Sequence, residues 1–368
     1  MTTPVRYRAL LLWSTGIVLV LGILAVWTAS AFSAMRVSPA ADSLHYLRGH
    51  LSRILFGLLL AFFAWKLKPG AVKLVAVPVY LISIVLLGLT VFMSGSEVAP
   101  VIHGSSRWLF LGPVRLLPSE LMRFGFVLLV AFMVSRGIWD VRKPGHLLQL
   151  LAAAMVPVAL MLMQPDFSGA AFMGAVMMVM LLLAGARFRH MVLLGLVALL
   201  LASASVISSP YRLTRVTSGL NESELSGSSY QPHQACIALG SGGLLGRGLG
   251  RGRQQRGFLP EAFSDYILAV IGEEAGFVGA MIVLSGLLMI CIAGWRIAAG
   301  ADTPFCSLAS GGFTAIISMG VLIHSGVVTK LLPPTGIPLP LVSWGGTSIV
   351  LTLAAVGFLA GTAGRSRA

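Results

Sequence analysis

Long, continuous apolar runs are the feature that most constrains what this chain can fold into. Each run is roughly 17 to 25 residues long. In the whole chain 57% of the residues are hydrophobic and only 10% are charged, and the mean hydropathy is +0.92. That balance excludes a soluble globular protein. Because lipid offers the backbone no hydrogen-bonding partner, spanning segments must be helices or a closed barrel, and continuous rather than alternating runs favour helices. We therefore predict an all-α integral membrane protein, with residues 1–368 forming a single polytopic domain.

About ten transmembrane helices are predicted. The first run, Ala9 to Phe32, follows two arginines and contains Ala29-Ser30-Ala31, which resembles a signal-peptide cleavage site. The run is longer than the roughly 7 to 15 residues of a signal core, so we interpret it as a retained span. The others are expected at 51–66, 71–93, 119–135, 146–163, 167–185, 190–208, 265–295, 305–328 and 347–363.

The basic residues of the short connections all fall on one side of this arrangement. By the positive-inside rule that side is cytoplasmic, and an even number of spans places both termini there. Most acidic residues, and the long connections 94–118, 209–264 and 329–346, then lie on the outer face. Long loops on a rigid scaffold are where function is usually built. We expect the loop 209–264, between the seventh and eighth helices, to carry part of an extracytoplasmic active site.

Within this loop, glycine alternates with arginine or leucine over residues 246–253. Backbone N–H groups and guanidinium groups in such a stretch suit phosphate oxygens. Three features argue against a nucleotide-binding loop: the Gly-Lys-Ser/Thr ending is missing, no strand precedes the segment, and the segment is predicted to be extracytoplasmic. The same location argues against nucleic acid. The alternative is a flexible basic loop that contacts lipid headgroups.

Asp265 is predicted to open the eighth span. A carboxylate half buried at the mouth of a helical bundle would have a raised pKa and could act as a general base. The alternative is a helix N-cap, which aspartate also favours. Further along, Glu273 and Glu274 lie roughly 12 Å deeper in the same span. They are expected to be neutral, or to pair with a basic residue that the pattern does not identify.

Other polar positions have simpler interpretations. Pro118-Ser119-Glu120 and Gln164-Pro165-Asp166 open spans and are explained as caps, helix breakers or ion pairs. His324 fits a hydrogen-bonded core histidine. The three cysteines are interpreted as packing residues, since they are too few and too scattered for a disulfide framework or a metal cluster.

Several motifs occur in a characteristic order along the chain. They are Arg107-Trp108 with Leu111-Gly112, Pro118-Ser119-Glu120, Gln164-Pro165-Asp166, Pro210 to Leu213 with Arg215-Val216, Tyr230 to Gly243, Leu259-Pro260-Glu261 with Asp265, Ile271 to Glu274, and Pro334 to Pro340 with Ser343, Gly345, Gly346 and Ser348. In this order they resemble the SEDS family of bacterial cell-wall synthesis, which includes FtsW, RodA and SpoVE. Pro210-Tyr211-Arg212 leans towards FtsW. The chain departs from the usual family pattern at Leu117, Arg123, Gly219, His324, Lys330 and Trp344.

The resemblance implies a ten-helix fold that polymerises lipid II into glycan strands, working with a class B penicillin-binding protein and other divisome or elongasome proteins. It also implies that Asp265 is catalytic, which favours the general-base interpretation over the cap. Further residues of the matching stretches and of the glycine–arginine run are expected to bind substrate. They are Arg107, Glu120, Asp166, Arg212, Arg215, Gln231, Ser241, Arg247, Arg251, Glu261 and Ser343.

The expected reaction joins two lipid-linked disaccharides with inversion at the anomeric carbon, and undecaprenyl pyrophosphate leaves. Asp265 would deprotonate the attacking sugar 4-hydroxyl, while arginines would hold the pyrophosphate charge. A divalent cation (Mg²⁺ or Mn²⁺) is compatible with this chemistry, although no metal-ligand spacing is found. Two alternatives remain: a flippase that moves lipid II across the bilayer, and a non-catalytic scaffold for the penicillin-binding protein.

Overall fold

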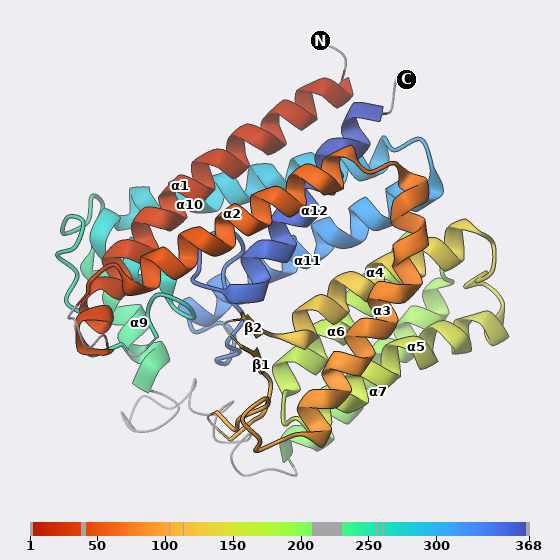
Figure 1. Cartoon of the computed structure of the whole chain (residues 1–368), viewed down its shortest axis with the longest axis horizontal. Coiled ribbons are helices and arrows are strands. Elements are labelled where there is room, and N and C mark those ends of the chain that lie inside the picture. The colour runs from red at the N-terminus through yellow and green to blue at the C-terminus, as the bar shows by residue number, and fades with distance from the viewer. Residues whose placement is uncertain are drawn as a thin grey trace.

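The computed structural model describes residues 3–37, 42–102, 104–112, 114–207, 230–254, 257–259 and 261–365, and these are mostly helical (Figure 1). The helices are α1 (Thr3–Val37), α2 (His45–Lys66), α3 (Pro69–Phe92), α4 (Pro118–Ser135), α5 (Pro144–Met163), α6 (Phe167–Leu183), α7 (Phe188–Ile207), α9 (Tyr230–Ser241), α10 (Ile267–Ala299), α11 (Pro304–Val328) and α12 (Gly346–Arg365).

Every predicted span corresponds to one of these helices. Among the described residues, eight helices are long and apolar enough to cross a membrane: α1 to α5 and α10 to α12. The apolar helices α6 and α7 occupy the other two predicted positions but have shorter apolar segments. The prediction of a multi-pass helical membrane protein is thereby confirmed. The largest boundary differences are at the starts of two helices: α1 begins at Thr3 rather than at Ala9, and α2 begins at His45 rather than at residue 51.

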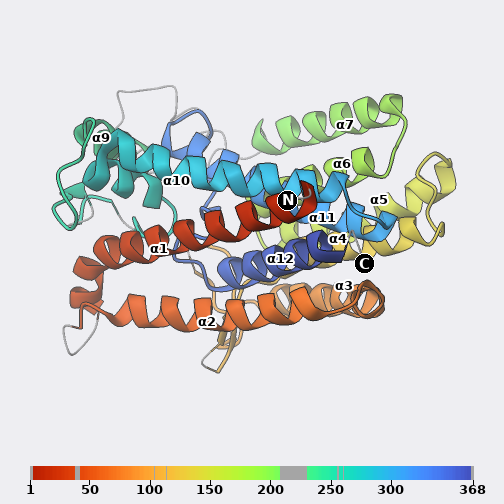
Figure 2. The ribbon, with the colours of Figure 1, turned by 90° about the horizontal axis from the view of Figure 1, so that it is seen from above.

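The helices pack in two groups, which meet at the buried helices α4, α11 and α12 (Figure 2). In one group α1 packs along α10, and α2 packs along α12. In the other, α3, α5, α6 and α11 surround α4, and α7 packs at the edge against α6. Because α4, α11 and α12 are mostly buried, they form the central scaffold. The remaining helices expose many large apolar side chains, such as Leu55, Phe92 and Leu200, as expected for a surface that faces lipid.

The two ends of the described chain lie close together at one end of the bundle, and α9 lies at the opposite end (Figure 1). This agrees with the predicted placement of both termini on one side and, for α9, of the 209–264 loop on the other. The assignment of the terminal side to the cytoplasm remains a prediction.

Two elements between the spans were not predicted. A short antiparallel hairpin, β1 (Leu109–Leu111) and β2 (Val114–Leu116), leads into α4, with Leu109 paired to Leu116. The helix α9 lies inside the predicted loop and packs on α10. Burial raises the pKa of its Cys236 thiol, so the thiol stays protonated and donates to the Val328 carbonyl at 3.5 Å. All three cysteines are free, as expected for packing residues.

Candidate functional site

Asp265 lies in a tight turn just before α10. The backbone carbonyl of Glu261 accepts hydrogen bonds from the N–H groups of Ser264 (3.0 Å) and Asp265 (3.2 Å), and Glu261 has a positive φ of 52°. The Ser264 hydroxyl donates to Asp265 Oδ1 at 3.1 Å. The Asp265 side chain is half buried, so it is both held by its neighbours and reachable.

The structure places Asp265 one residue before the N-cap of α10, not at the cap position itself. The N-cap residue of α10 is Tyr266, and α10 begins at Ile267 rather than at Asp265. Asp265 therefore lies in the turn before the cap position, where its Oδ1 accepts a hydrogen bond from the Ser264 hydroxyl.

The connection between α11 and α12 holds the Asp265 turn in place. Ser343 Oγ accepts from the Leu339 N–H (2.8 Å) and donates to the Ser264 carbonyl (2.6 Å). The Trp344 N–H donates to the Phe263 carbonyl at 2.9 Å. Ser343 is therefore placed to position Asp265, and its hydroxyl is already engaged by the protein itself.

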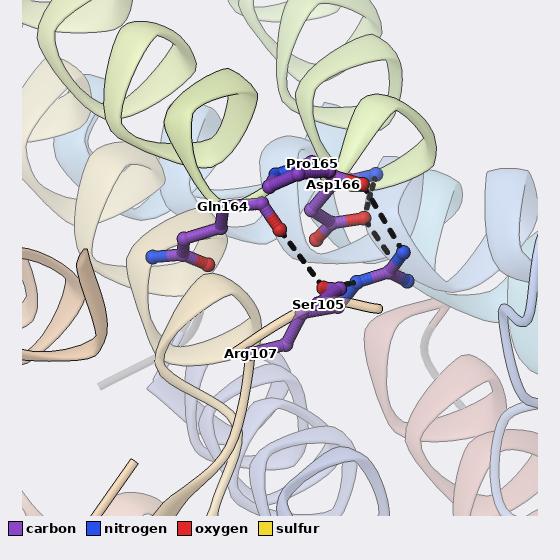
Figure 3. Close-up of polar contacts among 6 residues, drawn as sticks. Ser105, Arg107, Gln164, Pro165 and Asp166 are labelled. Atoms are coloured by element: carbon purple, nitrogen blue, oxygen red, sulfur yellow. Dashed lines mark hydrogen bonds and ion pairs between the residues drawn. The ribbon is translucent and has the colours of Figure 1, made fainter. Parts of the chain in front are cut away.

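A second cluster ties the segment before β1 to the turn between α5 and α6 (Figure 3). Arg107 forms an ion pair with Asp166 (3.3 Å), and its guanidinium also donates to the Ser105 hydroxyl (2.7 Å) and the Pro165 carbonyl (3.3 Å). The Ser105 hydroxyl in turn donates to the Gln164 carbonyl at 2.8 Å. Asp166 is also the N-cap of α6, where Oδ1 accepts from the Gly169 N–H, as the simpler interpretation predicted.

Arg107 and Asp166 line a small pocket that we call the charged pocket. Three of its buried polar atoms, Ser119 Oγ, Arg123 Nε and Thr335 Oγ1, have no hydrogen-bonding partner within the described part of the chain. Buried donors of this kind require a ligand or water. The pocket is lined by Arg107, Leu117, Ser119, Glu120, Arg123, Asp166, Ser168, Gly169, Thr335, Gly336, Ile337 and Pro338.

Gly336 connects the charged pocket to Asp265. It lines the pocket, and a Cβ added to it would lie 3.5 Å from Asp265 Oδ2. Residues from α4, from the turn before α6 and from the α11–α12 connection thus meet beside one half-buried carboxylate. Such an arrangement of two arginines, two acids and free donors suits a polar, charged ligand, next to a group that can accept a proton.

The glycine–arginine loop, residues 242–254, is folded against the first part of α10. Glu273, which is fully buried, accepts the N–H groups of Arg253 (2.8 Å) and Gln254 (3.2 Å) and pairs with Arg247 at 3.7 Å. Glu274 accepts the Gly250 N–H at 2.9 Å. The sequence did not identify a partner for Glu273 and Glu274. The structure shows that this partner is the glycine–arginine loop.

Glycine is required where the loop meets α10. Gly276 has φ 69° and ψ −169°, which breaks the helix, and a Cβ there would overlap the backbone at Leu244 and Gly246. A Cβ at Gly246 would likewise overlap the Glu274 carbonyl. Several loop N–H groups that the spacing offered to phosphate are consequently used within the protein, by Glu273 and Glu274.

The other predicted substrate-binding residues are distributed around these features. Glu120 lies in the charged pocket, near Ser348. Gln231 and Ser241 are on α9, and the Ser241 carbonyl accepts from Arg247 Nε at 3.1 Å. Arg251 is exposed on the loop. Arg212 and Arg215 lie outside the described residues.

Some residues of this region were missed by sequence reasoning. Arg123 was noted as a family departure, yet it lines the pocket and lies over the Phe172 ring at 4.3 Å. Arg53 was not singled out, although a charge within a predicted span is a usable signal. His324 is a buried core histidine, as expected, with Nδ1 at 3.1 Å from the Ile337 carbonyl.

No group of three or more His, Cys, Asp or Glu side chains in the described ranges is arranged to hold a metal ion. The sequence left a divalent cation open as compatible with the chemistry, and that stays a prediction.

Known proteins are similar to this chain over nearly its whole length. A family model for FtsW, RodA and SpoVE, described as "Cell cycle protein", matches residues 8–367. Stage V sporulation protein E of Bacillus subtilis is 34% identical and covers 97% of this chain and 95% of its own length. The probable peptidoglycan glycosyltransferase FtsW of Trichlorobacter lovleyi is 33% identical and covers 92% of this chain and 88% of its own length.

Two solved structures share the fold. A chain from "Structural coordination of polymerization and crosslinking by a peptidoglycan synthase complex" matches with a TM-score of 0.76 at 24% identity, covering 97% of both chains. The rod shape determining protein RodA of Thermus thermophilus matches with a TM-score of 0.69, also at 24% identity and 97% of both chains. Together with the matching family model, the full-length sequence similarity shows that this chain belongs to the FtsW/RodA/SpoVE family.

Proposed function

We propose that this protein is a peptidoglycan glycosyltransferase that polymerises lipid II at the outer face of the bacterial cytoplasmic membrane. The observation that carries the proposal is the similarity, over nearly the full length, to proteins named as probable peptidoglycan glycosyltransferases. It is supported by the position of Asp265 at the edge of a charged pocket.

In the proposed reaction Asp265 is the general base. Its carboxylate takes the proton of the acceptor 4-hydroxyl as that oxygen attacks the anomeric carbon of the donor, and the donor carbon–oxygen bond to undecaprenyl pyrophosphate breaks with inversion. A positioned base typically contributes about 10²- to 10⁴-fold in rate. The Ser264 hydroxyl and the Ser343 contact to the Ser264 carbonyl fix the turn that carries the base.

The charged pocket is proposed to hold the sugar and peptide portion of a substrate. Arg107, Glu120 and Asp166 offer both signs of charge there, and Ser119 and Thr335 offer buried hydroxyls that have no partner in the described protein. Arg251, Arg212 and Arg215 remain proposed as further contacts for phosphate. Arg247 is a weaker candidate because Glu273 neutralises it.

A protein partner is proposed on the same comparisons. One matched structure is described as a peptidoglycan synthase complex that couples polymerisation to crosslinking. We propose that this chain likewise assembles with a class B penicillin-binding protein. Purification from its native membrane without such a partner would contradict the assembly but not the activity.

A flippase is the second candidate, and the structure removes one reason for it. Glu273 and Glu274 were the polar groups within the bilayer that suited a transport path, but their described bonds run to the glycine–arginine loop. The test is purified protein reconstituted with lipid II and scored for polymer on a gel, with lipid II transport measured in the same vesicles. Polymer without added polymerase supports the proposal, whereas transport without polymer would establish the flippase.

A further inference from the structure

Arg53 is a charged residue inside a membrane-spanning helix without an acidic partner among the described residues. It lies in α2, its Nη1 atom is buried without a hydrogen-bonding partner, and its guanidinium stacks over the Trp344 ring at 4.5 Å. A charge at such a position is costly and usually marks a function. Stacking on Trp344 leaves the guanidinium edge free to donate.

Arg115 brings a second positive charge to the same place. It lies on β2, is exposed, and sits over the Phe110 ring at 5.0 Å. It is close enough to Arg53 for the two charges to act on each other, and no ion pair to it is formed within the part of the chain that the structure describes. Two like charges brought together repel each other, and an anion between them would turn that repulsion into attraction.

Both arginines flank the N-terminus of α12. A Cβ added to Gly346 would lie 3.7 Å from Arg53 Nε and 3.5 Å from the Arg115 carbonyl. The Thr347 hydroxyl accepts the Leu117 N–H at 2.8 Å, which fixes this helix start against the segment between β2 and α4. The first N–H groups of a helix lack partners within the helix, and together with the helix dipole they favour an anion.

The same residues are joined to the Asp265 turn. The Arg53 guanidinium stacks on the Trp344 ring, and the backbone N–H of Trp344 donates to the Phe263 carbonyl. Its neighbour Ser343 donates to the Ser264 carbonyl. An anion held at Arg53 would therefore lie near the proposed base. Elsewhere on the same helix, apolar side chains such as Leu55 and Phe56 are exposed to lipid.

We propose that Arg53, Arg115 and the first turn of α12 bind the pyrophosphate of a polyprenyl-linked saccharide. The proposal deepens the proposed function and rests on it for the identity of the saccharide. Two guanidinium groups and a helix N-terminus match a group with several phosphate oxygens better than a single carboxylate. The polyprenyl chain would extend into lipid along α2.

The test measures binding rather than turnover. The purified full-length protein is titrated with undecaprenyl pyrophosphate in detergent micelles, and the dissociation constant is compared for wild type, Arg53→Gln and Arg115→Gln. Each loss of a charge-assisted contact should weaken binding by about tenfold or more. Arg53→Lys, which keeps the charge but not the fork, should bind more tightly than Arg53→Gln.

Three controls make the result specific. Arg48→Gln, on the same helix but exposed and paired with Asp42, should bind like wild type. Phosphatidylglycerol should compete at least about tenfold more weakly than undecaprenyl pyrophosphate. Thermal unfolding of each variant confirms that it is folded, and a misfolded Gln variant is replaced by the Lys variant.

Unchanged binding in both Gln variants would overturn the inference, and so would equal competition by phosphatidylglycerol, which would make this a site for lipid headgroups. These outcomes are independent of the proposed function. If the wild type binds undecaprenyl pyrophosphate through Arg53 but makes no polymer, the pyrophosphate site stands and the glycosyltransferase proposal fails.

Discussion

Two arginine–carboxylate pairs in this protein look alike and are used differently. In Arg107–Asp166 and Arg247–Glu273 the arginine is about one third exposed (33% and 35%) and the acid is buried (6% and 1%). Asp166 lines the charged pocket beside atoms that have no partner in the described protein. Glu273 instead accepts the N–H groups of the glycine–arginine loop, so its pair closes that loop onto α10. What lies around a buried ion pair, rather than the pair itself, indicates its role.

The largest expected effect concerns the carboxylate beside the charged pocket. Asp265→Asn should lower the rate of lipid II polymerisation by about 10²- to 10⁴-fold, because an amide of similar size cannot accept a proton at neutral pH. Initial rates on gels, with the amount of folded protein measured in parallel, check this. A variant that polymerises like wild type would remove Asp265 from the mechanism.

A smaller loss is expected at the pocket's ion pair. Asp166→Asn should lower the polymerisation rate by about tenfold while the melting temperature stays close to wild type. Asparagine is still a good N-cap for α6, but it no longer neutralises Arg107. A large drop in melting temperature, with unchanged turnover of the folded fraction, would assign this pair the same structural role as Arg247–Glu273.

The Arg247–Glu273 pair should affect stability rather than activity. Glu273→Gln is expected to destabilise the protein by about 1–3 kcal/mol, because two loop N–H groups and Arg247 lose a charged acceptor. Denaturation monitored in micelles measures the loss, and the activity of the remaining folded protein should change little. If stability were unchanged and activity lost, Glu273 would belong to the reaction.

The smallest effect is expected at His324, which is hydrogen-bonded to the connection between α11 and α12. His324→Leu removes a hydrogen bond to the Ile337 carbonyl, which walls the charged pocket, and should cost about 1 kcal/mol of stability. His324→Asn keeps an N–H donor and is the matched control. Equal stability of the two variants would show that this bond does not support the pocket wall.

The fold was predictable because a chain in lipid must satisfy its backbone hydrogen bonds internally, which restricts spanning segments to helices or a closed barrel. Continuous apolar runs located every spanning helix. Pro118 and Pro144 stand in the first turn of α4 and α5, where a missing N–H costs nothing. The hairpin β1–β2 and helix α9 were missed, since each is short and is stabilised by packing against other elements rather than by a periodic pattern of its own.

The site was only partly predictable. Motifs placed Arg107, Glu120, Asp166 and Asp265 in one region, although they are far apart along the chain. Sequence spacing treated Asp265 as helical and the glycine–arginine loop as free to bind phosphate. Both errors arise from the break at Gly276 and the turn at Glu261, which reverse the backbone through positive φ and bring the loop onto Glu273. Such long-range contacts have no local signal.

The most direct test of the difference between the two pairs is a single comparison of Arg107→Gln with Arg247→Gln. Both variants remove one arginine from an ion pair of similar exposure, and polymerisation by each is expressed per amount of folded protein. The pocket variant should fall by at least about tenfold and the loop variant should stay within about threefold of wild type. A loop variant that loses as much activity as the pocket variant, while remaining equally stable, would contradict the assignment of the glycine–arginine loop to structure and of the charged pocket to substrate.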